Sequence, residues 1–479
     1  MSIDISEKCG VFAAAAREGY SDELGFYVYK GLLKLKHRGH ESAGICVWDA
    51  TNSLRIIKDK GTVDVVFQEY KGENPLNLLA GANGIGHVRY STSGESARKN
   101  AQPIIFDFHG KHAAIAHNGN LTNIEKLEHI LEGRSVCNLP EASTSDTGLI
   151  ACLIATSAKE TFWEAFCETL SILEGSFSLV AMCENIICAA RDRHGFRPLY
   201  VGVTEKFLLV ASETVALDLF EPRNISEVSP GYAIRFVGGQ YGIHDQLRWA
   251  EAKRRECIFE EAYFSHPASR HRDGSSYQMM REKTGRELAR EHNIVSQNSV
   301  PQVVVAVPDS GNGAAHGYAR ACGKTLAQAI IREHMGRSFI QPLVELREEK
   351  NNLKFTYIPE HIRGKEILLI DDSLVRGTTA KRIIKNLRKH GAARVILLLA
   401  FPAVRHPCFW GIDFPTYGEL IAPNRAEDEI ARKIGADGVH YISLEGFQKA
   451  RAEFGLKLEE ACTHCVTGHR PPDSEKSVV

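Results

Sequence analysis

The sequence contains no long hydrophobic run and no excess of charge of either sign. No stretch approaches the ~18 apolar residues of a membrane-spanning helix, and the first eight residues lack the apolar segment of a secretory signal. The 58 basic and 59 acidic residues give a formal charge of -1, which provides no overall field for nucleic acid or a membrane. We therefore expect a cytoplasmic protein that binds neither and that holds any anionic ligand locally.

The sequence also lacks an internal repeat and any added DNA-binding module. Its 12 cysteines include several inside apolar runs, such as Cys183 and Cys188. Disulfides are rare in reducing compartments, so we expect buried thiols or metal ligands rather than a disulfide framework. Cys462 and Cys465 form a CxxC pair, whose spacing alone suits zinc, an iron-sulfur cluster, redox chemistry or chance.

The length of 479 residues suits two domains of roughly 200 residues each. Residues 9–240 contain many short β-like runs, with helical stretches near 21–36 and 145–157, which predicts an α+β domain ending in a hairpin. Across residues 255–467, the strand-like segments VVVAVPD, ILLIDD and VILLLAF alternate with helical patterns, as in a doubly wound parallel sheet. The composition of residues 468–479 predicts a disordered tail.

The segment 367–379, ILLIDDSLVRGTT, is the most informative in the chain. An apolar run typical of a buried parallel strand leads into Asp371 and Asp372, and then into a loop that opens a helical pattern. Ligands of open α/β sheets collect at the carboxyl ends of strands, and backbone N–H groups at a helix start can hold a phosphate. A ribose-phosphate site is therefore expected here, although an ordinary capped turn would also explain the acidic pair alone.

This segment resembles the phosphoribosylpyrophosphate (PRPP) loop of type I phosphoribosyltransferases. Three other stretches, VPDSGNGAAHGYA at 307–319, GRSFIQP at 336–342 and HPCFWGIDFPTYGELIA at 406–422, are similar to the glutamine PRPP amidotransferase family of purine synthesis. The resemblance runs from Cys9 to Gly468 in the order of the family's motifs. It implies an N-terminal-nucleophile αββα sandwich followed by a type I phosphoribosyltransferase doubly wound parallel sheet.

The resemblance makes the N-terminal half a class II glutaminase with Cys9 as its nucleophile. Residues 1–8 are then a propeptide whose removal frees the α-amine, which has a reference pKa of about 8 and can accept the thiol proton at little cost. The motif HNGNLTN supplies Asn118 and Gly119 as the oxyanion hole. We expect this Asn-Gly pair on a turn, where it could also form an ordinary hairpin.

The same resemblance assigns three residues to the glutamine substrate. Arg89 in GHVRYSTSG matches the arginine that holds the α-carboxylate, and Asp146 in STSDTGL matches the acid that pairs with the α-amino group. Arg38 belongs to the family's HRG turn, after which this chain has His40 where glutamine is usual. Together these residues would select an amino acid.

The second site would bind PRPP with Mg²⁺, which keeps several waters and borrows oxygens from substrate phosphates. The PRPP-binding residues implied are Asp309, Ser310, Asp371, Asp372, Ser373, Arg376, Gly377, Thr378 and Thr379. Of these, Ser310, Asp371 and Asp372 would also contact the magnesium. A mobile loop would seal a passage for ammonia, and near this loop the chain differs from the family pattern at Arg332, Glu333, His334 and Thr356.

Four cysteines, Cys257, Cys408, Cys462 and Cys465, match the ligands of a [4Fe-4S] cluster in the propeptide-bearing branch of the family. Four thiolates would satisfy a tetrahedral zinc ion equally well, and the resemblance favours iron-sulfur. The cluster's role would be structural, because the chemistry involves no electron transfer.

The leading interpretation is therefore an enzyme that forms 5-phosphoribosylamine from PRPP, glutamine and water, in a homo-oligomer that is a dimer or a tetramer. One alternative is a PRPP-binding regulatory paralogue without turnover, but its glutaminase domain would then have no use. A second alternative is an amidotransferase with a different ammonia acceptor. Its support is the departure from the family pattern at residues 332–334.

Overall fold

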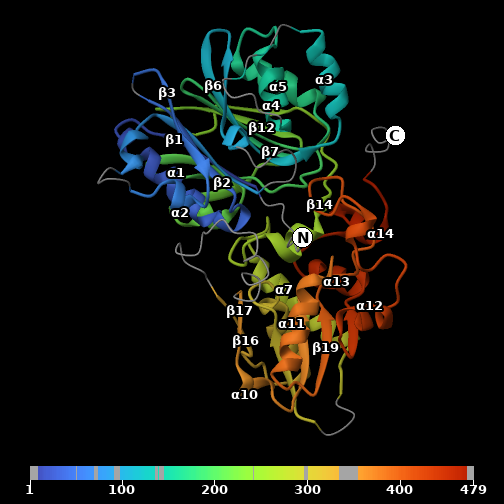
Figure 1. The fold of residues 1–479 in the computed structure, drawn as a ribbon. Coiled ribbons are helices and arrows are strands. Elements are labelled where there is room, and N and C mark those ends of the chain that lie inside the picture. The colour runs from blue at the N-terminus through green and yellow to red at the C-terminus, as the bar shows by residue number, and fades with distance from the viewer. Residues whose placement is uncertain are drawn as a thin grey trace.

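Two antiparallel sheets packed face to face form the N-terminal half of the chain (Figure 1). The computed structural model describes residues 9–49, 51–69, 74–90, 98–134, 137, 139, 145–240, 242–295, 300–333 and 354–471. The first sheet has the order β11-β9-β10-β1-β4-β2-β3 and the second β13-β12-β8-β7-β6-β5. The first sheet comprises β1 Gly10–Ala16, β2 Ser42–Trp48, β3 Leu54–Lys60, β4 Asn83–Arg89, β9 Tyr200–Val203, β10 Phe207–Ala211 and β11 Asn224–Glu227. The second comprises β5 Ile104–Phe108, β6 Lys111–Leu121, β7 Gly175–Cys183, β8 Ile186–Arg191, β12 Tyr232–Val237 and β13 Asp245–Arg248.

Strand β1 shows why this sandwich needs a helix layer on its outside. All seven of its residues are buried, and alternate side chains point to opposite faces of the sheet. Val11 and Ala13 pack between the sheets, while Phe12 and Ala14 pack on the helical side. The helices of that side are α1 Leu24–Lys34, α2 Val63–Val66 and α6 Thr214–Asp218, and those on the other sheet are α3 Ile124–Glu132, α4 Asp146–Ala155 and α5 Phe162–Ile172. The predicted αββα sandwich is confirmed, and the β12–β13 hairpin extends it to Arg248.

The C-terminal half is built on a parallel sheet of order β15-β18-β19-β20, with helices on both faces (Figure 1). Its strands are β15 Gln302–Ala306, β18 Glu366–Asp371, β19 Arg394–Leu399 and β20 Gly438–Tyr441. Helices α7 Tyr277–Glu291, α8 Asn312–Cys322 and α13 Leu444–Ala452 cover one face, and α11 Thr378–Lys389 and α12 Glu427–Ile434 cover the other. The predicted doubly wound arrangement is confirmed.

Short elements complete this half and join it to the first. They are β14 Glu256–Cys257, the π-helical turn η5 Glu260–Phe264, β16 Ile330–Arg332, β17 Phe355–Tyr357, α10 Pro359–Ile362, β21 Ala461–Cys462 and α14 His464–Thr467. Single 3-10 turns lie at η1 Ser21–Glu23, η2 Lys36–Arg38, η3 Pro75–Leu78, η4 Arg98–Asn100, η7 Tyr417–Glu419 and η8 Leu458–Glu460. Strand β14 pairs in parallel with β21, so the end of the chain is bound to the start of this domain.

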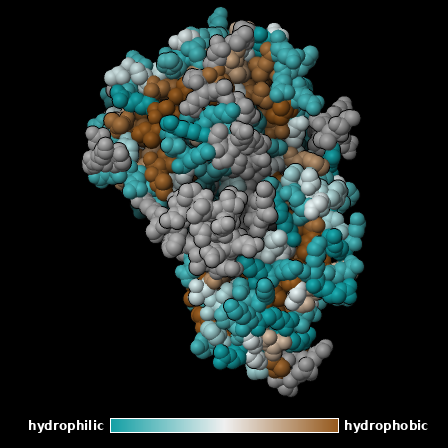
Figure 2. Space-filling view, viewed as in Figure 1, coloured by the Kyte–Doolittle hydropathy of each residue, from teal (hydrophilic) through white to brown (hydrophobic). Residues whose placement is uncertain are grey.

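The hydropathy of the surface differs between the two domains (Figure 2). On the face shown, hydrophilic residues cover most of the lower domain, and hydrophobic residues gather on the upper, N-terminal domain. Phe26 of α1 and Leu78 of η3, two elements in mutual contact, are among the exposed large apolar side chains. Of the helices described, none has the length and apolar character needed to cross a bilayer.

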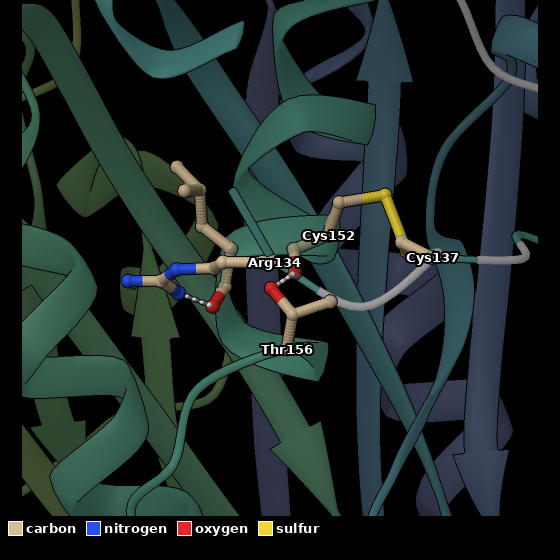
Figure 3. Close-up of a disulfide and its surroundings, with 5 residues drawn as sticks. Arg134, Cys137, Cys152 and Thr156 are labelled. Carbon is tan, nitrogen blue, oxygen red and sulfur yellow. Dashed lines mark hydrogen bonds between the residues drawn. A yellow bond between two sulfur atoms is a disulfide. The ribbon is translucent and has the colours of Figure 1, made fainter. Parts of the chain in front are cut away.

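The expectation of free thiols is wrong for one pair of cysteines. Cys137 and Cys152 form a disulfide with a Cα–Cα distance of 5.5 Å, which fastens Cys137 to helix α4 (Figure 3). Among the other cysteines described, Cys46, Cys183 and Cys188 are buried free thiols. Sequence spacing did not reveal the pair, because a separation of 15 positions carries no local signal that two cysteines are bonded.

Replacing Cys152 with serine should lower the free energy of unfolding by about 3 kcal/mol in oxidising buffer, the entropy effect of opening a loop of this length. Urea denaturation of the parent and Cys152→Ser, each with and without dithiothreitol, measures this difference. Reductant should bring the parent to the stability of the variant. Equal stabilities in oxidising buffer would show that the bond does not form in solution.

Candidate active sites at the domain junction

Cys9 lies immediately before β1 and is partly buried. Its thiol is 3.7 Å from the carbonyl oxygen of Tyr90, the residue that follows β4. Gly10 pairs with Val88 across these two neighbouring strands, which places Cys9 beside the end of β4. The predicted propeptide, residues 1–8, lies outside the described part of the chain.

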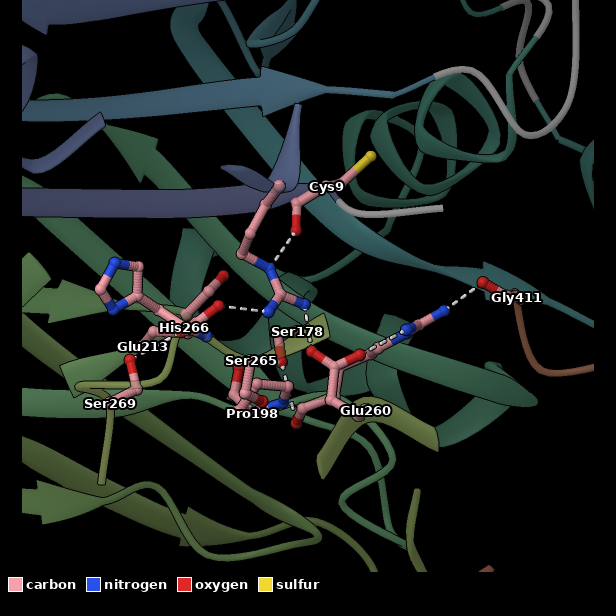
Figure 4. Close-up of polar contacts among 12 residues, drawn as sticks. Cys9, Ser178, Pro198, Glu213, Glu260, Ser265, His266, Ser269 and Gly411 are labelled. Carbon is pink, nitrogen blue, oxygen red and sulfur yellow. Dashed lines mark hydrogen bonds and ion pairs between the residues drawn. The ribbon is translucent and has the colours of Figure 1, made fainter. Parts of the chain in front are cut away.

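Arg38 holds the backbone of Cys9 (Figure 4). Its Nε donates to the Cys9 carbonyl oxygen at 2.8 Å, its Nη1 donates to Glu213 at 2.5 Å, and its Nη2 pairs with Glu260. The side chain is fully buried. Burial lowers the pKa of Arg38, but the charges and hydrogen bonds of Glu260 and Glu213 outweigh it and raise that pKa. These contacts position the backbone of Cys9, the predicted nucleophile, and the predicted contact of Arg38 with glutamine stays a prediction.

Glu213 joins the two domains at this point. Its carboxylate accepts hydrogen bonds from His37 at 2.8 Å and, from the C-terminal half, from the Ser269 hydroxyl at 2.6 Å and the His266 backbone N–H at 2.8 Å. Burial alone would raise the pKa of Glu213, but the charges of His37 and Arg38 and these hydrogen bonds hold it well below its ordinary value. No local sequence pattern marks this glutamate as a contact between the domains.

Asn118 has a buried amide donor, Nδ2, that no described residue satisfies. The side chain is 2% exposed, and its Nδ2 has no hydrogen-bond partner among the residues described. An unsatisfied buried donor typically costs ~1–3 kcal/mol, so such a group calls for a functional explanation. An amide held ready for a developing oxyanion provides one.

The predicted turn at Asn118 and Gly119 is wrong, because both residues lie inside β6 and pair with Ser178 and Phe177 of β7. Glycine is required at 119 for a different reason. A Cβ there would lie 2.0 Å from the carbonyl oxygen of Ser176, so any side chain would collide with the neighbouring strand.

Two buried histidines, His87 and His117, are joined to each other and to Asp146, one of the residues predicted to bind glutamine. The Nδ1 of His117 lies 3.5 Å from the Asp146 carboxylate, and the ring of His87 donates to the His117 carbonyl at 2.9 Å. Burial lowers the pKa of His87 to about 3, so this ring is neutral. Burial raises the pKa of Asp146, but the charge and hydrogen bond of His117 hold it below its ordinary value. Arg89, at the end of β4, pairs with Glu41 at 3.1 Å.

The acidic pair predicted to bind PRPP lies at the carboxyl end of β18. Asp371 and Asp372 are both buried, the Asp372 N–H donates to Asp371 at 2.9 Å, and the Ser373 hydroxyl donates to Asp372 at 2.5 Å. Burial and the neighbouring charge of Asp372 raise the pKa of Asp371 well above its ordinary value. Two such carboxyls ionise together only near a cation, and their hard oxygens suit Mg²⁺ or sugar hydroxyls.

The predicted loop and helix follow this strand. Gly377 has a φ of 79°, and a Cβ there would lie 2.5 Å from Ile421, so glycine is required. Helix α11 begins at Thr378, so the N–H groups of Thr378 and Thr379 lie in its first turn, where they can bind a phosphate. Arg376, in the same loop, makes its hydrogen bonds to the segment at 413–419. It donates to Glu419 at 2.8 Å and to the Asp413 carbonyl at 2.9 Å.

The predicted pyrophosphate residues lie between β15 and α8. Asp309 is 3.3 Å from Arg332, and Ser310 lines a cavity of about 10 Å³ together with Asp372 and Arg281. Arg281, from α7, is a residue that the sequence did not suggest. The sealing-loop segment GRSFIQP and His334 lie outside the described ranges.

Two of the departures from the family pattern contact each other. Thr356 donates its hydroxyl to the Glu333 carboxylate at 2.6 Å, at the end of the β16–β17 pair. The acid at position 333 therefore has a hydrogen-bond donor at position 356.

The four predicted cluster ligands gather beside the domain junction. Cys257 and Cys462 face each other in the β14–β21 pair, and the Arg405 and His406 N–H groups anchor Cys465 through its carbonyl oxygen. Burial raises the pKa of Cys462 to about 12 and those of Cys257 and Cys465 well above the ordinary value, with the other thiols of the group adding to it. In the described ranges, no three His, Cys, Asp or Glu side chains are placed to ligate one ion.

Comparison with known proteins agrees with this arrangement. Residues 87–219 match the family described as "Glutamine amidotransferase domain". The amidophosphoribosyltransferase of Synechocystis is 38% identical over 97% of this chain and 91% of its own length, and that of Bacillus subtilis is 36% identical over 99% and 96%. The chain belongs to the amidophosphoribosyltransferase family.

Solved structures of the family share the whole fold. The B. subtilis glutamine PRPP amidotransferase complexed with ADP and GMP has a TM-score of 0.84 at 35% identity, covering 97% of both chains. A structure titled as the allosteric regulatory enzyme of purine biosynthesis has a TM-score of 0.86 at 35% identity, covering 98% of both. The sequence-based expectation of a glutamine-dependent amidophosphoribosyltransferase is confirmed.

Replacing Asn118 with alanine should lower glutamine-dependent turnover about 10²–10³-fold, because the variant loses a donor that acts only on the developing oxyanion. Ammonia-dependent pyrophosphate release should stay near the parent value. Asn123→Ala is the matched control, since that side chain donates to the Ile172 carbonyl at 2.9 Å and has a structural partner. Equal losses in the two variants would contradict the assignment.

Proposed function

We propose that Cys9 hydrolyses glutamine in the first domain and that the ammonia released attacks C1 of PRPP in the second. The observation that carries this proposal is the shared junction. Arg38 touches the Cys9 backbone on one side and Glu260 of the second domain on the other, and Ser176 and Asn120 of the first domain donate to the Trp410 and Phe409 carbonyls at 2.7 and 3.2 Å.

In the first half-reaction the Cys9 thiolate attacks the amide carbon of glutamine. The oxygen gains negative charge near Asn118, whose unsatisfied Nδ2 supports its role as a donor, and Gly119 is proposed as the second donor. Collapse expels ammonia and leaves a thioester, which water converts to glutamate and free Cys9. Arg89 and Asp146 are proposed to hold the α-carboxylate and the α-amino group.

In the second half-reaction ammonia displaces pyrophosphate from C1 and gives 5-phosphoribosylamine. The Ser373–Thr379 loop is proposed to hold the 5′-phosphate, with Asp371 and Asp372 on the ribose hydroxyls. Bound Mg²⁺ would neutralise pyrophosphate charge, with Ser310 and the two acids nearest to it. The role of these residues is positioning and charge neutralisation. A chelator should abolish pyrophosphate release, and added Mg²⁺ should restore it.

Cys9→Ala tests the coupled reaction. The variant should lose glutamine-dependent pyrophosphate release and keep release at high ammonia concentration, because only the ammonia source is removed. Both activities can be followed by a coupled pyrophosphate assay, with the intact N-terminal mass measured on the same sample. Persistence of both in the variant would refute the glutaminase assignment, and absence of both in the parent would favour a binding protein without turnover.

We further propose that Cys257, Cys408, Cys462 and Cys465 hold a structural [4Fe-4S] cluster. Support comes from four thiols that the fold gathers from three distant segments, with Cys257 and Cys462 paired across β14 and β21. Analysis of anaerobically purified protein should find about four iron and four sulfide per chain. One zinc per chain instead would refute this proposal alone.

A cytoplasmic homo-oligomer, a dimer or a tetramer, completes the proposal. The exposed apolar side chains of Phe26 and Leu78 on the first domain support association between copies. Sedimentation velocity that finds only monomer would refute it.

A further inference from the structure

Arg376, in the middle of the loop predicted to bind the 5′-phosphate, is held by two acidic residues of another segment. Its Nη2 donates to Glu419 at 2.8 Å and to the Asp413 carbonyl at 2.9 Å, and the same nitrogen lies 3.5 Å from the Asp413 carboxylate. The Arg376 side chain is 14% exposed. Its charge is therefore balanced by residues that lie 37 and 43 positions further along the chain.

Glu419 uses its two carboxylate oxygens for different contacts. Its Oε1 accepts from Arg376, and its Oε2 accepts from the backbone N–H and the hydroxyl of Thr416 at 3.3 and 3.4 Å, which caps the turn η7. The acid that binds Arg376 is thus already fixed by its own turn. A side chain fixed in this way loses little rotamer freedom when the ion pair forms, so it can define the place of the guanidinium.

The backbone on either side of Arg376 is fastened to the same segment. The Val375 carbonyl accepts from the Ile421 N–H at 2.7 Å, and Ile421 is 2% exposed. The Ile421 side chain fills the space beside Gly377, where a Cβ would lie 2.5 Å from it. Three successive residues of the loop are therefore held by residues 413–421.

This arrangement favours one of two roles for the Arg376 side chain. If the guanidinium bound PRPP directly, a phosphate dianion would have to approach a group that already has two carboxylates beside it, and like charges repel. The first turn of α11 presents the backbone N–H groups of Thr378 and Thr379, which can bind a phosphate without Arg376. The guanidinium is better placed to shape the loop than to bind the ligand.

We propose that Glu419 and Asp413 are positioning residues for the PRPP site, which act on the substrate through Arg376. They hold the guanidinium so that the loop keeps the shape in which its backbone N–H groups converge on the 5′-phosphate. Arg376 then contributes to PRPP binding by fixing the loop and does not touch the phosphate. This inference rests on the proposed function, since it takes the loop at 373–379 as the phosphate site.

The test follows ammonia-dependent pyrophosphate release with PRPP varied at saturating Mg²⁺. Glu419→Gln removes the charge beside Arg376 and keeps an acceptor oxygen for Thr416, because glutamine also serves in a capping box. The KM for PRPP should rise at least about tenfold, the effect of losing one charge-assisted hydrogen bond, while kcat stays within about twofold. If Arg376 bound PRPP directly, the same variant would release the guanidinium and leave the KM unchanged or lower it.

Arg376→Met and the double variant that combines it with Glu419→Gln complete a mutant cycle. Arg376→Met should raise the KM by a similar factor, and the double variant should be no worse than either single one, because both changes break the same contact. Ribose 5-phosphate, which has the phosphate but no pyrophosphate, is used as a competitive inhibitor of each variant. Its inhibition constant should rise in parallel with the KM, since it reports on the phosphate loop alone.

The matched control is Arg388→Met, at the opposite end of α11 from the loop. Arg388 also joins a carboxylate and a carbonyl, since it pairs with Asp437 and donates to the Ala393 carbonyl at 3.2 Å. Its replacement should leave the KM for PRPP within about twofold of the parent value, as expected for a contact remote from the site.

Each outcome decides the inference. A higher KM in Glu419→Gln, no further rise in the double variant and an unchanged control support it. An unchanged or lower KM in Glu419→Gln, effects that multiply in the double variant, or a raised KM in the control overturns it. Loss of release at every PRPP concentration in both single variants would show a purely structural role and also overturns it. A parent without ammonia-dependent release overturns the proposed function instead, and the inference falls with it.

Discussion

The buried guanidinium of Arg38, held between Glu213 and Glu260, is the interaction on which both domains depend. Removing one partner from such a pair typically costs ~3–5 kcal/mol, because the remaining charge has no access to water. Glu213 belongs to the first domain and Glu260 to the second, so the two halves share one cation. Arg38 also donates to the Cys9 carbonyl, so the same side chain that joins the domains fixes the backbone of the predicted nucleophile.

The two sites use one structural principle in different sheets. At the end of β18 a parallel strand delivers two carboxylates to the start of a helix, where backbone N–H groups add a complementary charge. In the sandwich, Cys9 and Arg89 lie at ends of neighbouring antiparallel strands, and Asn118 projects from within the facing sheet. Rigid strands fix the reacting groups in each case, and the segments that join the strands bring the domains together.

Local patterns explain what the sequence could predict. The strand, loop and helix at 367–379 follow from apolar runs, Gly377 and helical spacing within a few residues of one another, and the structure confirms them. Contacts between distant residues explain what was missed. Glu213 lies 175 positions from Arg38, and no feature of the residues around Glu213 indicates its partner. The turn expected at Asn118 and Gly119 is wrong because Asn-Gly is a hairpin signal only when no neighbouring strand continues the pairing.

The β14–β21 pair has a consequence for biosynthesis. Its first strand contains Cys257 and its second contains Cys462, so the ribosome must complete nearly the whole second half before the two can meet. The glutaminase sandwich ends well upstream and can fold while translation continues. The second domain closes only after Ala461 and Cys462 have emerged, and a nascent chain halted before Ala461 leaves the edge of β14 without its partner.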